Sequence, residues 1–259
     1  MSEQISRRRA LGAVGAAGLG AVLTACSRGG GGTGGQSTAT SSSTTTRAGG
    51  GAAAAGPVTA ELFDTATACT LAPEMTEGPY YFDVDSIRTD VREDREGAAL
   101  RLGVRVRDAS SCTPVSDAVV DIWHCDALGL YSGFEAASTG TGGGGGAGPT
   151  DDETYLRGAQ ITNGDGIAEF VTVYPGWYRG RTVHIHAKVH LDKSTMLTTQ
   201  LFFDDGFTER IYAREPYASD TGRDTFNDDD GIFDDALLLT LSERGDETLG
   251  LITLDVAAG

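Results

Sequence analysis

The sequence predicts an all-β fold, a β-sandwich of mostly antiparallel strands with long loops and little helix. Eight short segments show either alternation of apolar and polar residues or short apolar runs, and both patterns are typical of strands. Glycine-rich turns separate these segments, and glycine accounts for 37 of the 259 residues. Many short strands joined by such turns favour a β-sandwich.

The expected elements follow one another along residues 99–256. In the first, aliphatic residues at 100, 102, 104 and 106 alternate mainly with arginines, so one face is apolar. The second is centred on Ile122, and the third and fourth flank Asn163-Gly164-Asp165-Gly166, a strong hairpin signal. Residues 207–213 can form a short helix. Strands are expected at 99–107, 118–125, 155–161, 166–173, 183–189, 198–203, 237–241 and 249–256.

The strand expected at 183–189 has one apolar face and one face that can bind a metal. Small and branched apolar residues alternate there with His184, His186 and Lys188, and the same face continues to His190. Residues i and i+2 of a strand point the same way, so His184 and His186 can share one metal ion. The pattern alone leaves two other interpretations open. The histidines can be hydrogen-bonded without a metal, or His190 or His124 can complete a zinc or copper site.

Two tyrosines stand in suggestive settings near these histidines. Tyr131 ends the stretch WHCDALGLY at 123–131, and Tyr178 ends the turn-like stretch YPGWY at 174–178. A tyrosine in a sandwich is more often half-buried than bound to a metal. A phenolate, however, is a hard anionic ligand, and two phenolates with two imidazoles favour Fe(III) over Fe(II).

The first 58 residues predict export and a flexible tether. Ser6-Arg7-Arg8-Arg9-Ala10 is similar to a twin-arginine export signal, and the apolar run at 12–23 is too short to span a bilayer comfortably. The lipobox-like Leu23-Thr24-Ala25-Cys26 predicts a signal peptide at 1–26, a lipid on Cys26, and anchoring to the membrane at the cell surface or in the periplasm. A plain signal peptide with a coincidental Cys26 is the alternative. Residues 27–58 are too poor in apolar bulk to bury a core, which leaves one folded domain at 59–259.

The formal net charge of −17 argues against nucleic acid and anionic headgroups as partners of the domain. Acidic residues are concentrated at 224–235. The run Asn227-Asp228-Asp229-Asp230-Gly231 does not match the EF-hand spacing, so we expect a solvated acidic loop there.

Three cysteines follow Cys26, and an exported protein can keep a disulfide between two of them. Cys112 and Cys125 are expected at opposite ends of one strand, too far apart to pair. Cys69 is therefore the expected partner of one of them, with the other thiol free. The sequence does not choose between the two.

From about residue 69 to 256 the chain resembles the intradiol ring-cleavage dioxygenases, the superfamily of protocatechuate 3,4-dioxygenase and catechol 1,2-dioxygenase, and most of all their exported members. The resemblance rests on several motifs in order: TEGPYY (76–81), VDIWHCD (120–126), GLYSG (129–133), YLRG (155–158), YPGWYRGRTVHIH (174–186) and TQLFFD (199–204). It implies a β-sandwich that cleaves a catecholic ring with O2 between its hydroxyl-bearing carbons, giving a cis,cis-muconate-type diacid.

The resemblance also implies roles for individual residues. One Fe(III) per chain would be held by four ligands: Tyr131, Tyr178, His184 and His186. Tyr178 would also accept a proton from the catechol, and Arg181 would stabilise negative charge on the bound aromatic. Substrate contacts would come from Arg181, Gln200, Pro79 and Tyr80. The alternatives are a surface ion pair for Arg181, an ordinary strand hydrogen bond for Gln200 and simple core packing for Tyr80.

The chain departs from the family pattern at two places. Thr182-Val183 stands where cytoplasmic members usually have Pro-Ala before His-Ile-His, and the N-terminal helical dimerisation region of catechol dioxygenases is replaced by the tether. Dimerisation in their manner is therefore not expected. A rival hypothesis is an exported β-sandwich module that binds an aromatic or a carbohydrate without turnover.

Overall fold

The computed structural model describes residues 56–63, 69–139 and 148–258. The predicted signal peptide at 1–26, the lipidated Cys26 and nearly all of the tether at 27–58 lie outside these residues. So do residues 140–147 of the glycine-rich stretch. Within the described ranges, no helix is long and apolar enough to cross a membrane.

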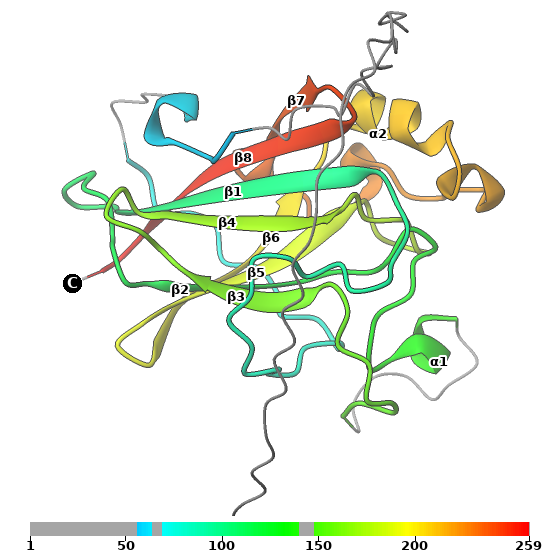
Figure 1. The fold of residues 1–259 in the computed structure, drawn as a ribbon, viewed down its shortest axis with the longest axis horizontal. Helices are drawn as coiled ribbons and strands as arrows, with labels where there is room; N and C mark the ends of the chain where they lie inside the picture. Colours follow the sequence, from blue (N-terminus) through cyan, green and yellow to red (C-terminus); the bar gives the residue numbers. More distant parts are fainter. Residues whose placement is uncertain (1–55, 64–68, 140–147, 259) are drawn as a thin grey trace, which may run out of the picture. The chain divides into compact units, whose positions relative to one another are not determined.

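Two four-stranded sheets form the sandwich (Figure 1), which confirms the predicted all-β class. One sheet has the order β4 (Ile167–Val173), β1 (Ala99–Asp108), β8 (Glu247–Val256), β7 (Thr240–Arg244). The other has the order β3 (Arg157–Ile161), β2 (Val119–Trp123), β5 (His184–Leu191), β6 (Ser194–Phe202). Neighbouring strands are antiparallel except β1 and β8, which run parallel.

Helical structure in the described residues is short. Helix α2 (Asp205–Tyr212) confirms the helix expected at 207–213, and it begins two residues earlier. The carboxylate of Asp204 caps it by accepting from the Phe207 N–H at 2.6 Å. The others are α1 (Glu135–Ser138) and four 3-10 turns: η1 (Ala60–Leu62), η2 (Tyr217–Ser219), η3 (Asn227–Asp229) and η4 (Asp235–Leu237).

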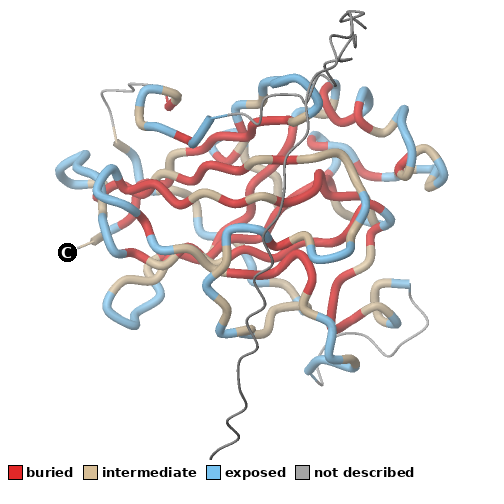
Figure 2. Tube along the Cα trace, in the orientation of Figure 1, coloured by how far each residue is buried: buried red, intermediate tan, exposed pale blue. Residues whose placement is uncertain are grey.

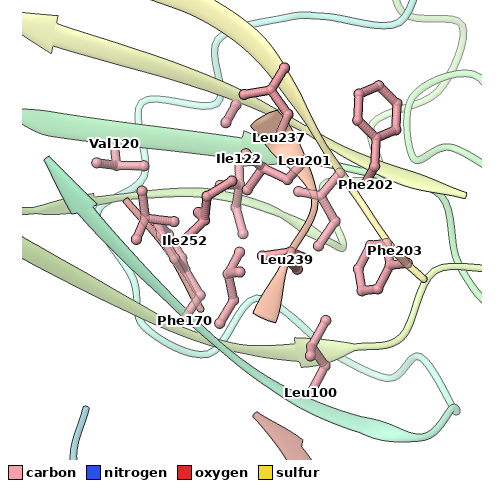
Figure 3. Packing of buried hydrophobic residues seen from close by; sticks show 14 of the residues in the cluster. Leu100, Val120, Ile122, Phe170, Leu201, Phe202, Phe203, Leu237, Leu239 and Ile252 are labelled. Carbon is pink, nitrogen blue, oxygen red and sulfur yellow. The ribbon is translucent and has the colours of Figure 1, made fainter. Parts of the chain in front are cut away.

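The core lies between the sheets and is built from the alternating apolar residues of the strands. Figure 3 shows side chains of both sheets in this core, among them Leu100 and Ile252 of one sheet and Val120, Ile122 and Leu201 of the other. Burial is concentrated along the strands, whereas the connecting loops are mostly exposed (Figure 2). Because side chains alternate across a strand, the residues between these core positions point to the outer faces of the sheets.

The disulfide left open by the sequence joins Cys69 to Cys112, with a Cα–Cα separation of 5.7 Å. Cys125 is a buried free thiol that contacts the carbonyl of Gly176 at 3.4 Å. Cys112 and Cys125 both lie outside β2, so the prediction that they stand at the two ends of one strand is wrong. The prediction that Cys112 and Cys125 do not pair with each other is confirmed. Closing a 43-residue separation stabilises the fold by about 4 kcal/mol in the chain-entropy description.

Candidate metal centre

His184 and His186 stand on the outer face of the sheet β3-β2-β5-β6. Ile185 and Ala187 of the same strand point into the core, which turns both histidines away from it. Both imidazoles are nevertheless only 2 % exposed. The segment around Gly78 covers His186, because a Cβ on Gly78 would lie 3.1 Å from the imidazole Cε1. Gly78 also has a φ of +74°, a region that favours glycine.

Three candidate ligand atoms converge at the start of β5. The Tyr178 hydroxyl lies 3.0 Å from His184 Nε2, which lies 3.1 Å from His186 Nε2. His184 Nδ1 is 2.7 Å from the carbonyl of Thr182. A carbonyl can only accept, so Nδ1 carries the proton and the Nε2 lone pair of His184 faces the other two atoms.

Tyr131 brings a fourth candidate ligand. Its side chain is fully buried, and its hydroxyl has no hydrogen-bond partner among the described residues. The ring lies edge-on to Tyr178, with ring centres 5.7 Å apart, and 6.1 Å from His186. Leaving a buried hydroxyl unpaired costs about 1–3 kcal/mol. An orphan hydroxyl beside two imidazoles is an arrangement that a bound cation would satisfy.

The four side chains fit a metal ion by donor chemistry and by spacing. Two ligands about 2.1 Å from one ion and at roughly a right angle to each other stand about 3 Å apart, close to the separations of 3.0 and 3.1 Å seen here. In the part of the chain that the structure describes, no group of three or more His, Cys, Asp or Glu residues could hold a metal. The donors that lie beside the two imidazoles are the phenols of Tyr131 and Tyr178, and phenolates favour a trivalent cation.

Burial sets the protonation of these groups. It lowers the pKa of His184 to about 3, with help from the nearby positive charge of Arg181, and burial likewise lowers the pKa of His186. Both imidazoles are therefore neutral at pH 7, as metal ligands must be. Burial raises the pKa of Tyr131 and of Tyr178, so these phenols stay protonated at pH 7 unless a cation binds.

Tyr131 and Tyr178 meet because two loops pack together. Asp126 organises the loop after β2: its carboxylate accepts from the N–H groups of Leu128 and Leu130, both at 2.9 Å. Its carbonyl accepts from the Gly176 N–H at 2.9 Å, which ties this loop to the turn that carries Tyr178. Gly129 makes the approach possible, because a Cβ there would lie 2.4 Å from the carbonyl oxygen of Trp177.

The predicted substrate contacts gather around the same place. Arg181 Nη2 donates to Gln200 Oε1, and Gln200 Nε2 donates to the Thr76 carbonyl at 2.9 Å. Gln200 is also the register partner of His186 on the adjacent strand. The Tyr80 ring packs against the Tyr131 ring at a tilt of 38°, with ring centres 4.8 Å apart. Pro79, next to Tyr80 in the chain, is exposed.

The three-histidine alternative is wrong. The strand register shifts between Val189 and His190, and the ring of His190 contacts Thr195 Oγ1 at 3.1 Å. His124 is fully buried elsewhere, between the Cys125 carbonyl and Thr172 Oγ1, both at 2.7 Å. Neither histidine lies within hydrogen-bond distance of His184 or His186.

Two residues near the site have no role in the sequence-based prediction. Trp123 stacks on His186 with ring centres 4.9 Å apart and planes 7° apart. The guanidinium of Arg157, in a side chain 1 % exposed, donates to Ser132 Oγ and to the Ser132 carbonyl, both at 2.8 Å. The motifs VDIWHCD and YLRG contain these residues, but only the register of β2 against β5 reveals that Trp123 faces His186.

A groove of about 400 Å³ lies on the outer face of this sheet. Tyr81, Asp121 and His190 are among the residues that line it. Burial raises the pKa of Asp121 to about 6, and the negative charge of Asp83 adds to the effect, while Tyr81 and Lys188 partly oppose it.

This raised pKa predicts that ionisation of Asp121 lowers the stability of the fold at higher pH. The folded state holds the Asp121 proton more tightly than the unfolded chain, so its stabilising effect is full below pH 4 and is lost as the pH rises through 6. Asp121→Asn should therefore raise the free energy of unfolding by roughly 1–2 kcal/mol at pH 8 and by much less at pH 4. Thermal unfolding at both pH values measures the difference. Asp165→Asn, on the exposed hairpin tip, controls for the loss of one negative charge. Equal effects of Asp121→Asn at pH 4 and pH 8 would contradict the prediction.

Comparison with known proteins gives a consistent set of similarities. A family model described as Dioxygenase matches residues 73–212. The chain is 28 % identical over 153 residues to a chlorocatechol 1,2-dioxygenase of Rhodococcus opacus, covering 49 % of this chain and 54 % of that protein. It is 31 % identical over 140 residues to a catechol 1,2-dioxygenase of Pseudomonas sp. (strain EST1001), covering 50 % of this chain and 46 % of that protein. The chain thus spans about half the length of the curated relatives it matches.

Solved structures resemble a larger part of the chain. An intradiol ring-cleavage dioxygenase from Tetranychus urticae superposes with a TM-score of 0.69 at 32 % identity, covering 74 % of this chain and 96 % of that one. The dioxygenase domain of a dioxygenase carbohydrate-binding protein fusion from Streptomyces sp. SirexAA-E superposes with a TM-score of 0.52 at 30 % identity. The match covers 73 % of this chain and 100 % of that one.

Proposed function

Because the chain belongs to the intradiol ring-cleavage dioxygenase family, we propose that it binds one ferric ion and cleaves a catecholic ring with O2. Cleavage falls between the two hydroxyl-bearing carbons and gives a cis,cis-muconate-type diacid. The curated relatives are named as catechol and chlorocatechol 1,2-dioxygenases, so catechol and chlorinated catechols are the first substrates to test.

The observation that carries the proposal is the convergence of two imidazoles and two phenols. His184, His186 and Tyr178 are joined by separations of 3.0 and 3.1 Å, and the orphan hydroxyl of Tyr131 is buried beside them. These four residues would hold the ion. When bound, ferric iron supplies Lewis acidity that withdraws electron density from the catechol oxygens.

The chain's own residues supply proton transfer and charge. Tyr178 Oη accepts one of the two catechol protons, and its place at the open end of the cluster suits that role, since Tyr178 is half-buried while Tyr131 is fully buried. Arg181 places a fixed positive charge where the aromatic ring becomes electron-rich. The Tyr80 ring packs against the Tyr131 ring, with ring centres 4.8 Å apart.

Metal content and colour test the proposal. The protein expressed with ample iron should contain about one iron per chain and absorb broadly in the blue-green region, as ferric tyrosinates do. It should also consume O2 with one or more catechols. His186→Ala should lose iron and colour, because it removes a ligand from a buried site. His190→Ala, four residues along the same strand, should keep both. A colourless, iron-free wild-type protein would refute the metal assignment.

A further inference from the structure

The acidic stretch after residue 224 is not simply a solvated loop, as the sequence suggests. Asp228 and Asp229 are exposed, but Asn227 and Asp230 are each 8 % exposed, and the Asp230 side chain is only 2 % exposed. The turn η3 folds this stretch back against the start of β5. Asp230 also lies outside the residues matched by the family model, 73–212.

Both carboxylate oxygens of Asp230 accept hydrogen bonds. Oδ2 accepts from Arg181 Nε and from the Thr182 N–H, both at 2.9 Å. Oδ1 accepts from the Ile232 N–H at 2.9 Å. Burial alone would raise the pKa of Asp230, but these N–H groups and the Arg181 cation outweigh it and lower the pKa, so the group is a carboxylate at pH 7.

The two residues that Asp230 binds both act on the candidate site. Arg181 uses Nε for Asp230 and Nη2 for Gln200, so its guanidinium is held from two sides. Among the described residues Nη1 makes no hydrogen bond and remains available to a bound molecule. The Thr182 carbonyl accepts from Nδ1 of His184 and so orients that imidazole.

A separate set of contacts anchors the stretch without Asp230. Thr182 Oγ1 donates to Asn227 Oδ1 at 2.6 Å, and Asn227 Nδ2 donates to the Phe203 carbonyl at 2.9 Å. Both Asn227 bonds are buried. The segment therefore has a structural anchor in Asn227. The Asp230 carboxylate adds two bonds to backbone N–H groups and is the group that neutralises and orients Arg181.

We infer that Asp230 is a positioning residue that holds the Arg181 guanidinium, and with it the Thr182 peptide, in the geometry the reaction needs. The inference rests on the proposed function, since Arg181 acts on the bound aromatic. A planar guanidinium held by Asp230 and Gln200 cannot swing out of the pocket, so its charge is in place before substrate arrives.

Four variants of the iron-loaded full chain test this: Asp230→Asn, Asp228→Asn, Arg181→Met, and Arg181→Met combined with Asp230→Asn. Asp228→Asn is the matched control, because it removes the same charge from an exposed position two residues away. Turnover is expressed per bound iron, so a loss of folded protein does not count as slower chemistry. Thermal unfolding is measured on every variant.

Asp230→Asn should lower kcat per iron by roughly 10- to 100-fold, because a misplaced charge loses most of its effect, while Asp228→Asn stays within about twofold. In the Arg181→Met background, Asp230→Asn should slow turnover no further, since the two residues act as one unit. Asp230→Asn should lower the Tm of the wild-type protein. In the Arg181→Met background it should raise the Tm, because Asp230 is there a buried charge without its cation. Asp230→Glu, which keeps the charge but displaces it, should slow turnover less and serves as the readout if Asp230→Asn does not fold.

An Asp230→Asn kcat per iron equal to that of Asp228→Asn, in a wild type that does cleave catechols, would overturn the inference alone. The inference would also be overturned if Asp230→Asn slowed turnover by the same factor in the wild type and in the Arg181→Met background. A wild type that cleaves no catechol would instead refute the proposed function. In that case the reversal of the Tm effect still decides whether Asp230 holds Arg181, and its absence would overturn the inference.

Discussion

Tyr178→Phe is expected to lower kcat by about two to four orders of magnitude, the usual loss when a positioned acid or base is removed. The substitution removes only the hydroxyl that lies 3.0 Å from His184 Nε2, and the half-buried ring can stay where it is. His184, His186 and Tyr131 would remain as ligands, and the Phe ring would still fill the place of Tyr178. Metal should therefore be retained, unlike in His186→Ala, which removes a ligand and also leaves a cavity. The absorption band should weaken and shift, because one of two phenolates is gone.

Tyr212→Phe is the control for this experiment. The Tyr212 hydroxyl donates to the Pro175 carbonyl at 2.9 Å, in the same turn that carries Tyr178. Its loss should cost about 1 kcal/mol of stability and leave kcat per iron within about threefold. Steady-state O2 uptake, normalised to iron, measures both variants. A kcat for Tyr178→Phe that matches Tyr212→Phe would exclude Tyr178 as the proton acceptor.

Gly129→Ala is expected to abolish the site by separating its two tyrosine loops. A Cβ at this position would stand 2.4 Å from the Trp177 carbonyl oxygen, which is backbone and cannot turn away. Either the loop that carries Tyr131 or the turn that carries Tyr178 must move. The φ of +80° adds strain of its own. We expect iron to be lost and the free energy of unfolding to fall by more than about 3 kcal/mol.

Gly245→Ala separates the clash from the backbone strain. Gly245, in the β7–β8 hairpin, has a φ of +66°, but a Cβ there would meet no atom within 4 Å. Its substitution should cost only the left-handed strain, about 1–2 kcal/mol, with iron unchanged. Chemical denaturation and metal analysis of the two variants give the comparison. Full iron content in Gly129→Ala would show that the two loops do not need this close approach.

Local patterns predicted most strands well, and they failed where the local signal was missing. The hairpin between β5 and β6 turns through Asp192 and Lys193, with φ of 48° and 67°, and contains no glycine. The sequence therefore gives no turn signal there, and the predicted strand begins at residue 198, four residues after the true start of β6 at Ser194. The strand predicted at 237–241 agrees with β7 only at residues 240–241, because Leu237 and Leu239 fill the core from a turn and a loop.

Most of strand β7 has no pattern in the sequence that would predict a strand. It begins at Thr240 and lies at the edge of its sheet, with almost all of its residues exposed. An edge strand without a buried face has no apolar alternation to detect. Its backbone pairs with β8, which is a long-range contact that composition does not record.

The sequence alone predicts the fold class and the chemical face of β5, because alternation with period two is a local property of the chain. It also supplied the donor types, since His184, His186, Tyr131 and Tyr178 can be read directly. The folded arrangement of the loops shows which of these atoms meet, which cysteine pairs with Cys69, and that His190 lies apart from the site. It also turned Asp230 from one acidic residue among several into the buried partner of Arg181. Each of these depends on loops that pack across long sequence separations, and such contacts leave no periodic pattern in the sequence.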